Sequence, residues 1–352
     1  MIIKFSKGLI LLVIVLLVFP GCGKFDRSGI KMPKFSFVTT ENLHSIALVD
    51  PQHLWASGNY GTILFSADGG KTWTEQKSGI KDLLLGCIEF VNPSQGWAAG
   101  VKGTIIHTGD GGKTWTKQES GIEEDIHDLF FFDSLHGWAV GEFGTVLHTG
   151  DGGRQWKRQM EETDKFYNGV FFADRKTGWI VGEFGTILHT RDGGETWQPQ
   201  TCPGLSALVE NADWDRPLPA LYGVFFHDRE NGWAVGMDGV IIKTVDGGKN
   251  WKLQEPVSDR PLYSIVIHGH KGWIVGNKGV YLMSDDGGQT WSEKQDAIKT
   301  KFWLREVAFY KNKQGLIIGA RGTIARTEDG GASWELVSGY RYDMEEFGLA
   351  DF

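Results

Sequence analysis

Thr108-Gly109-Asp110-Gly111-Gly112-Lys113-Thr114-Trp115 decides the fold, because the chain contains seven copies of its pattern. The pattern is Ser or Thr, any residue, Asp, Gly, Gly, any two residues and Trp. The other copies cover residues 66–73, 149–156, 190–197, 244–251, 284–291 and 327–334. Successive tryptophans of the pattern lie 42, 41, 41, 54, 40 and 43 residues apart. A period of about forty residues, repeated this often, is typical of a radial or solenoid repeat.

The Asp-Gly-Gly segment of each copy predicts a tight turn between two strands. Glycine adopts a positive φ at no steric cost, and an Asp carboxylate accepts hydrogen bonds from backbone N–H groups a few residues on. A calcium ion needs about six to eight oxygen ligands, and each turn offers a single carboxylate. We therefore expect no metal and predict a structural role for the aspartates of the seven turns, which are Asp68, Asp110, Asp151, Asp192, Asp246, Asp286 and Asp329.

Each repeat contains four strand signals, which in the second repeat cover residues 84–91, 96–100, 103–108 and 115–118. The first strand of each repeat is read as apolar throughout, as in Cys87-Ile88-Glu89-Phe90-Val91. Strands that pack on both faces lose the strict alternation of polar and apolar residues. We predict an all-β fold, a seven-bladed β-propeller of four-stranded antiparallel blades over residues 40–338. A β-helix would need shorter repeats and parallel strands.

A Gly-x-x-Gly element joins the second and third strands of each repeat, as in Gly58-Asn59-Tyr60-Gly61. A phosphate-binding glycine loop would lead into a helix N-terminus, and no helix is expected here. We therefore interpret these elements as hairpin turns. His107, His148 and His189 occupy one position in consecutive blades. Because packed sheets lie about 10 Å apart, these histidines cannot share a metal and are predicted to pack within the blades.

The N-terminal segment is typical of an export signal. Lys4 and Lys7 precede an apolar run over residues 9–19, which is short for a membrane span. We predict a signal peptide over residues 1–21, a tether over 22–39 and a C-terminal tail over 339–352. Gly21-Cys22 resembles a bacterial lipoprotein cleavage site, at which Cys22 would be lipidated. Ordinary cleavage and an uncleaved anchor remain alternatives. The predicted location is extracytoplasmic, on a membrane.

Net charge argues against nucleic acid as a partner. The chain has 36 Lys and Arg against 44 Asp and Glu, and loss of residues 1–21 would remove Lys4 and Lys7, leaving 34 − 44 = −10. Nucleic-acid binding needs a clustered positive surface. After such cleavage Cys87 and Cys202 remain inside the repeats, where a disulfide between them would be strained. We expect two free thiols, no cofactor and a monomeric propeller.

The meander topology places the Asp-Gly-Gly turns on one face of the ring. The Gly-x-x-Gly tips and the linkers between blades occupy the other face, which carries the length variation, including the long linker over residues 200–220. Long loops on a rigid scaffold commonly bind partners. Acidic residues with exposed Phe gather in blades two to four, and basic residues in blades six and seven. The predicted partner-binding residues are Tyr60, Glu142, Phe143, Glu183, Phe184, Asp213, Trp214, Asp215 and Arg321. A solvated rim with scattered charge is the alternative.

The octets resemble the Asp-box (BNR) repeats of sialidases, sortilin-type receptors and propeller glycosidases. The full unit, Gly-Trp-Ala-Val-Gly-x-x-Gly-Thr-Ile-Leu-x-Thr-x-Asp-Gly-Gly-x-x-Trp, more specifically resembles the photosystem II stability/assembly factor family, over about residues 40–338. That resemblance implies an exported, non-catalytic scaffold that binds a membrane or envelope protein. An arginine-rich partner surface in photosynthetic members matches only Arg321 and its basic neighbours here.

The alternative is a carbohydrate-binding or glycoside-hydrolysing protein. A sialidase-like site needs an arginine cluster, a Tyr/Glu pair and an acid, and the chain has no Phe/Tyr-Arg-Ile-Pro motif. A glycosidase uses two carboxylates about 5–10 Å apart. The acidic linkers, with Glu162 and Asp213, could supply such a pair, but no spacing singles one out. The sequence therefore favours a scaffold without catalysis.

Overall fold

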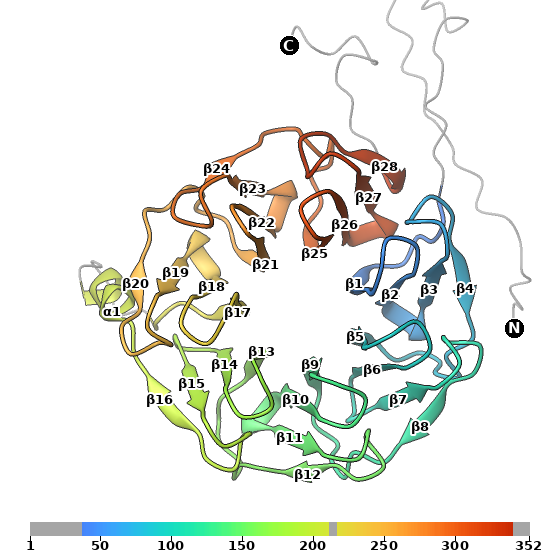
Figure 1. The fold of residues 1–352 in the computed structure, drawn as a ribbon, viewed down its shortest axis with the longest axis horizontal. Helices are drawn as coiled ribbons and strands as arrows, with labels where there is room; N and C mark the ends of the chain where they lie inside the picture. The colour runs from blue at the N-terminus through green and yellow to red at the C-terminus, as the bar shows by residue number, and fades with distance from the viewer. Residues whose placement is uncertain (1–36, 211–216, 341–352) are drawn as a thin grey trace, which may run out of the picture. The chain divides into compact units, whose positions relative to one another are not determined.

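The computed structural model describes residues 37–210 and 217–340. Within them the chain forms seven four-stranded antiparallel sheets around a common centre (Figure 1). The predicted seven-bladed β-propeller is confirmed. Residues 1–36, with the predicted signal and Cys22, and residues 341–352 of the predicted tail lie outside the described part, so those predictions stay predictions. In the described part, no helix has the length and apolar character needed to cross a membrane.

The strands follow one another blade by blade. Blade one contains β1 (Leu43–Leu48), β2 (Leu54–Gly58), β3 (Ile63–Ser66) and β4 (Thr74–Gln76). Blade two contains β5 (Leu85–Phe90), β6 (Gly96–Gly100), β7 (Ile105–Thr108) and β8 (Thr116–Gln118). Blade three contains β9 (Ile126–Phe131), β10 (Gly137–Gly141), β11 (Val146–Thr149) and β12 (Lys157–Arg158). Blade four contains β13 (Tyr167–Phe172), β14 (Gly178–Gly182), β15 (Ile187–Thr190) and β16 (Gln198–Gln200).

The remaining blades repeat this order. Blade five contains β17 (Leu221–Phe226), β18 (Gly232–Gly236), β19 (Ile241–Thr244) and β20 (Lys252–Leu253). Blade six contains β21 (Leu262–His268), β22 (Lys271–Gly276), β23 (Tyr281–Ser284) and β24 (Ser292–Glu293). Blade seven contains β25 (Leu304–Tyr310), β26 (Gln314–Gly319), β27 (Ile324–Thr327) and β28 (Glu335–Ser338). The first strand of each blade lies nearest the centre and the fourth lies at the rim (Figure 1).

The Asp-Gly-Gly turns are held by the hydrogen bonds that their sequence allows. In blade two the Thr108 hydroxyl donates to Asp110 Oδ1 over 2.8 Å and accepts the N–H of Gly112. The Thr114 N–H and hydroxyl donate to Asp110 over 2.9 and 2.7 Å. These Thr114 donors lower the pKa of Asp110 to about 2. The Asp110 carboxylate therefore stabilises the turn that contains it.

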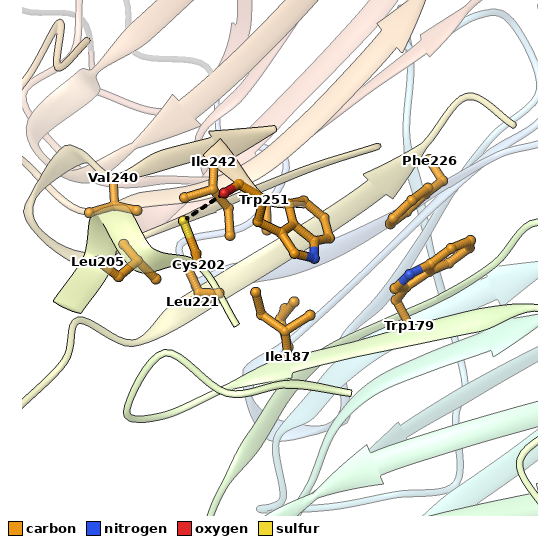
Figure 2. Packing of buried hydrophobic residues seen from close by; sticks show 11 residues of the cluster. Trp179, Ile187, Cys202, Leu205, Leu221, Phe226, Val240, Ile242 and Trp251 are labelled. Carbon is orange, nitrogen blue, oxygen red and sulfur yellow. Dashed lines mark hydrogen bonds between the residues drawn. The ribbon is translucent and has the colours of Figure 1, made fainter. Parts of the chain in front are cut away.

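Aromatic stacking joins one blade to the next. Trp179 of β14 is fully buried, and its ring lies 3.5 Å from that of Phe226 at the end of β17, as Figure 2 shows. Trp251, from the turn of blade five, meets Phe226 edge-on. The Trp179 indole N–H also donates to the Gly247 carbonyl of the next turn over 3.4 Å. One tryptophan thus ties a blade to both the strand and the turn of its neighbour.

The long linker before blade five contains a helix that the sequence analysis did not predict, α1 (Pro203–Glu210). Leu205 and Cys202 are buried against blade five, and the Cys202 thiol donates to the Trp251 carbonyl over 3.5 Å (Figure 2). Cys87 and Cys202 are both free, as predicted. The histidines of the third strands pack as expected: His107, His148 and His189 lie 4.9–5.0 Å from the rings of Trp97, Trp138 and Trp179.

Candidate functional site

The Gly-x-x-Gly tips project one side chain from each blade in a strained conformation. The residue before the second glycine has a φ of 51–57° in every blade, in Tyr60, Lys102, Phe143, Phe184, Asp238, Lys278 and Arg321. Holding a non-glycine residue in this left-handed region costs about 1 kcal/mol. The second glycine is required by close approach, because a Cβ on Gly61 would lie 2.3 Å from the Ile80 carbonyl oxygen. The tip therefore docks on the linker and points its preceding side chain outward.

Three of these tip residues are aromatic and exposed to solvent. Tyr60, Phe143 and Phe184 are 63%, 47% and 49% exposed. Phe143 and Phe184 belong to adjacent blades, and each follows an acidic residue, Glu142 or Glu183, that is half-buried. The Phe143 ring meets Phe166 edge-on at 5.4 Å. We call Glu142, Phe143, Glu183 and Phe184 the blade three–four tips.

A cavity of about 700 Å³ lies beside Phe143 on this face. Its walls include Glu142, Glu162 and Arg158. Arg158 donates to Glu124 over 2.8 Å, while its Nη1 atom is buried without a hydrogen-bond partner among the described residues. Part of the acidic charge beside this cavity is therefore already paired, in the ion pair between Glu124 and Arg158.

The other predicted partner-binding residues are not brought together with these tips. Asp213, Trp214 and Asp215 lie outside the described residues. Arg321 is in blade seven, where its guanidinium stacks on Phe302 at 4.6 Å and on Tyr340 at 5.7 Å. Its backbone N–H donates to Asn42. Arg321 thus joins the two ends of the described chain as well as facing solvent.

The centre of the ring holds a second feature, a channel that the sequence analysis missed. Its cavity measures about 370 Å³ and is lined by the first strands. Each first strand carries a β-bulge at its second residue, and a bulge re-aims a side chain. The bulged residues are His44, Gly86, His127, Asn168, Tyr222, Tyr263 and Arg305. They form a ring at the channel mouth on the same face as the Gly-x-x-Gly tips.

Three bulged side chains bond to neighbouring protein groups. His44 lies 3.0 Å from Asn59 Oδ1, His127 lies 3.1 Å from the Tyr167 carbonyl, and the Asn168 amide donates to the Leu221 carbonyl. Burial lowers the pKa of His44 to about 4, so this histidine is neutral at pH 7. These contacts are structural and fix the mouth.

Below the mouth, two carboxylates bridge adjacent blades. Asp128 accepts the Val170 N–H of blade four over 2.9 Å, and Glu306 accepts the Ile46 N–H of blade one over 2.7 Å. Burial in the channel raises the pKa of Asp128 to about 6 and that of Glu306 to about 7. The first strands are thus not apolar throughout, which corrects the sequence interpretation.

Glu89 is the deepest charged side chain of the channel. It is the fifth residue of β5, where the other blades carry Ala, Val or Phe. It makes no hydrogen bond or ion pair with any described residue. Burial raises the pKa of Glu89, with further increases from Glu306 and Asp128. A carboxyl among apolar residues in an inner strand was a visible signal that the sequence analysis did not use.

Sequence comparison identifies the family. The family model described as Photosynthesis system II assembly factor YCF48 matches residues 28–120, 79–163, 117–216 and 209–300, which together span most of the propeller. The chain belongs to this family. The resemblance drawn from the repeat unit is confirmed. No curated protein sequence matches the chain.

Solved structures share the fold of this YCF48-family chain. A structure titled "YCF48 bound to D1 peptide" has a TM-score of 0.68 and 22% identity, covering 83% of this chain and 94% of its own. YCF48 from Cyanidioschyzon merolae has a TM-score of 0.65 and 18% identity, covering 83% and 97%. The GH74 xyloglucanase from Xanthomonas campestris has a TM-score of 0.69 and 11% identity, covering 86% of this chain but 55% of the enzyme.

Proposed function

We propose that this protein is a non-catalytic scaffold that binds a segment of a membrane or envelope protein through the blade three–four tips. The main observation in support is the exposure of Phe143 and Phe184 on adjacent tips, each held in a left-handed conformation. Membership of the YCF48 family supports this role. The D1 peptide belongs to another member of the family, and here it supports only the class of partner.

The chemistry of the tips defines the segment that would bind. Two exposed Phe rings supply apolar area, and Glu142 and Glu183 beside them favour a segment that carries positive charge. The cavity beside Phe143 offers a depression for one side chain of the partner. A basic segment with apolar anchors is therefore the expected ligand of this surface.

Photo-crosslinking in the native host tests the proposal. A photoreactive phenylalanine analogue at position 143 or 184 should crosslink to one membrane or envelope protein. The same analogue at Lys113, which is exposed on the opposite face, is the matched control. We expect Glu142→Lys with Glu183→Lys to reduce crosslinking severalfold while the unfolding temperature is kept. Equal crosslinking from position 113, or none from 143 and 184, would contradict the proposal.

We further propose that Cys22 is lipidated and holds the propeller outside the cytoplasm at a membrane. The motif Gly21-Cys22 after an apolar run supports this. In cells fed a labelled fatty acid, the wild-type chain should carry the label and sediment with membranes. Cys22→Ser should lose both properties. Label that persists in Cys22→Ser would refute lipidation at this residue.

Glycoside hydrolysis is the weaker candidate. Among the described carboxyls, those with raised pKa values lie in the channel, and Asp128 and Glu306 use oxygens to accept backbone N–H groups. Glu162, in the wall of the cavity beside Phe143, lies 4.0 Å from Arg158 in an exposed ion pair. Turnover of aryl glycosides that Glu162→Ala abolishes would favour the enzyme over the scaffold.

A further inference from the structure

The central channel contains two charged side chains of opposite sign that make no hydrogen bond or ion pair with residues 37–210 or 217–340. Arg305, at the mouth, lies 5.3 Å from the Tyr263 ring and makes no hydrogen bond or ion pair with the described residues. Glu89, deeper in the channel, is likewise unpaired within the part of the chain that the structure covers. Both side chains are half-buried, and the charge of Arg305 partly offsets the raised pKa values of Asp128 and Glu306 without a bond to either carboxyl. Two such groups in one cavity indicate a ligand that pairs with both.

The mouth end of the channel suits a carboxylate. Arg305, Tyr222 and Tyr263 are bulged residues of three consecutive blades, and the two tyrosine rings lie 5.6 Å apart. The tyrosine hydroxyls have no hydrogen-bond partner among the described residues. A guanidinium with two phenolic O–H donors can bind both oxygens of one carboxylate. The other polar bulged residues, His44, His127 and Asn168, are already bonded to the protein and remain outside this group.

The deep end suits an ammonium group. Glu89 lies three residues further along an equivalent strand, about 10 Å below Arg305 at the usual rise per residue. Asp128 and Glu306 add negative charge near it. The remaining wall at this depth is apolar and includes Phe225, Val266 and Ala308. A methylene chain would therefore contact apolar groups between the two charged ends.

We propose that the channel binds a small dipolar molecule, with its carboxylate at Arg305, Tyr222 and Tyr263 and its ammonium group at Glu89. Several methylene groups separate the two ends, as the α-carboxylate and ε-ammonium are separated in lysine. The cavity of about 370 Å³ is within the range of small-molecule sites. This site is distinct from the blade three–four tips, and its occupation does not depend on partner capture.

The electrostatics of the channel agree with this assignment. Burial and the neighbouring acids raise the pKa of Glu89, which favours its neutral form when nothing is bound. An ammonium beside Glu89 reverses that preference, because an opposite charge stabilises the carboxylate. The bound state thus replaces an uncompensated carboxyl by an ion pair. The guanidinium at the mouth, which is near the Asp128 and Glu306 carboxyls and bonded to neither, gains a direct ion pair in the same event.

Calorimetric titration of the full chain with 6-aminohexanoate and L-lysine tests the proposal. Both probes should bind, while hexanoate and hexylamine, which each lack one charged end, should bind about tenfold or more weakly, since a hydrogen bond to a charged group is worth that factor. Glycine, in which the charges are too close, should not bind. Arg305→Gln and Glu89→Gln should each weaken 6-aminohexanoate about tenfold or more.

Lys113→Gln and Glu75→Gln make the same charge changes at exposed sites outside the channel and should leave binding unchanged. Hexanoate binding as tightly as 6-aminohexanoate, with no effect of Glu89→Gln, would show an anion site alone and overturn the proposal. Absence of binding by every probe at millimolar concentration would also overturn it. If a channel variant fails to fold, the probe series on the wild-type chain still decides. None of these results bears on crosslinking at positions 143 and 184.

Discussion

Six seams between blades are alike, and the seventh, where blade seven meets blade one, is different. In the six alike seams a tryptophan of the second strand donates its indole N–H to a glycine carbonyl of the next turn. These tryptophans are Trp55, Trp97, Trp138, Trp179, Trp233 and Trp273. At the seventh seam Leu316 occupies this place and packs among aliphatic residues of blades seven and one. Within the described residues, no indole N–H donates from one blade to the other at the closing seam, and Trp73 donates to the Gly70 carbonyl of its own turn.

Contacts between the two ends of the described chain distinguish the closing seam. Val38 donates its N–H to the Ser338 hydroxyl over 3.1 Å. Gly322 donates to the Glu41 carbonyl and Ile46 donates to Glu306, as Gly61 donates to Leu83 and Val170 to Asp128 at other seams. Such contacts require closure of a very long loop, whereas the other seams join neighbouring repeats. The difference shows that local repeat chemistry builds six seams, while polar contacts of the chain ends complete the ring.

The largest expected effect is the loss of a tryptophan from an alike seam. Trp138 is fully buried, stacks on Phe172 at 3.6 Å and donates to the Gly193 carbonyl over 2.9 Å. Trp138→Leu should lower the free energy of unfolding by about 3 kcal/mol, because it opens a cavity and removes one of the two hydrogen bonds that this carbonyl accepts, the other coming from the Gln159 side-chain amide over 3.3 Å. Urea denaturation measures the change.

Leu316→Ala at the closing seam is the matched comparison, with an expected loss of about 2–3 kcal/mol from cavity formation alone. If Trp138→Leu proved harmless while Leu316→Ala unfolded the ring, the closing seam, and not the six alike seams, would determine the stability of the propeller.

A smaller effect, with a defined pH dependence, is expected from Glu306, whose carboxylate spans the closing seam. Its pKa rises from 4.5 to about 7 on folding, mainly by burial. Between those pH values the folded protein holds more protons than the unfolded chain, so the stability of the wild type falls as pH rises. Glu306→Gln keeps an oxygen to accept the Ile46 N–H and carries no charge. Above pH 7 it should be more stable than the wild type by about 2–3 kcal/mol.

The advantage of Glu306→Gln should vanish below pH 4.5, where the wild-type carboxyl is protonated in both states. Asp128→Asn at an alike seam is the control, and its advantage should be complete at a lower pH than that of Glu306→Gln, because the pKa of Asp128 rises only to about 6. Unfolding titrations from pH 4 to pH 8 give both curves. Equal differences at all pH values would mean that the carboxyl is not desolvated in the folded ring.

The fold was predictable because its determinants are local. Asp110, Thr108 and Thr114 make their turn within seven residues, so the octet alone specifies it. The break in the Gly-Trp pattern at Leu316 is also visible in the sequence. Each repeat therefore carried enough information to predict the ring.

The candidate sites were less predictable because they depend on geometry that periodicity does not encode. A bulge directs Arg305 toward the channel, and one bulge shifts which residues share a face. Glu89 meets Asp128 and Glu306 only once three blades are assembled. Arg321 finds Phe302 and Tyr340 because the chain ends converge. The tips Phe143 and Phe184 could be placed on one face, since equivalent turns of a meander lie together.

The smallest effect is expected from rebuilding the closing seam as an alike seam. Leu48 stands where five of the other six blades carry the Phe on which the tryptophan stacks, for example Phe90 under Trp55 at 3.8 Å, and where blade six carries Ile267. Leu316→Trp alone should destabilise by about 1–2 kcal/mol, since a Cβ on Gly70 would already lie 3.2 Å from Leu316 and the site is filled. Adding Leu48→Phe should recover about 1 kcal/mol, the value of a stacked aromatic pair. A double-mutant cycle by urea denaturation isolates this coupling. Zero coupling would show that the two introduced rings do not stack, and that the closing seam cannot be converted into an alike seam by these two substitutions.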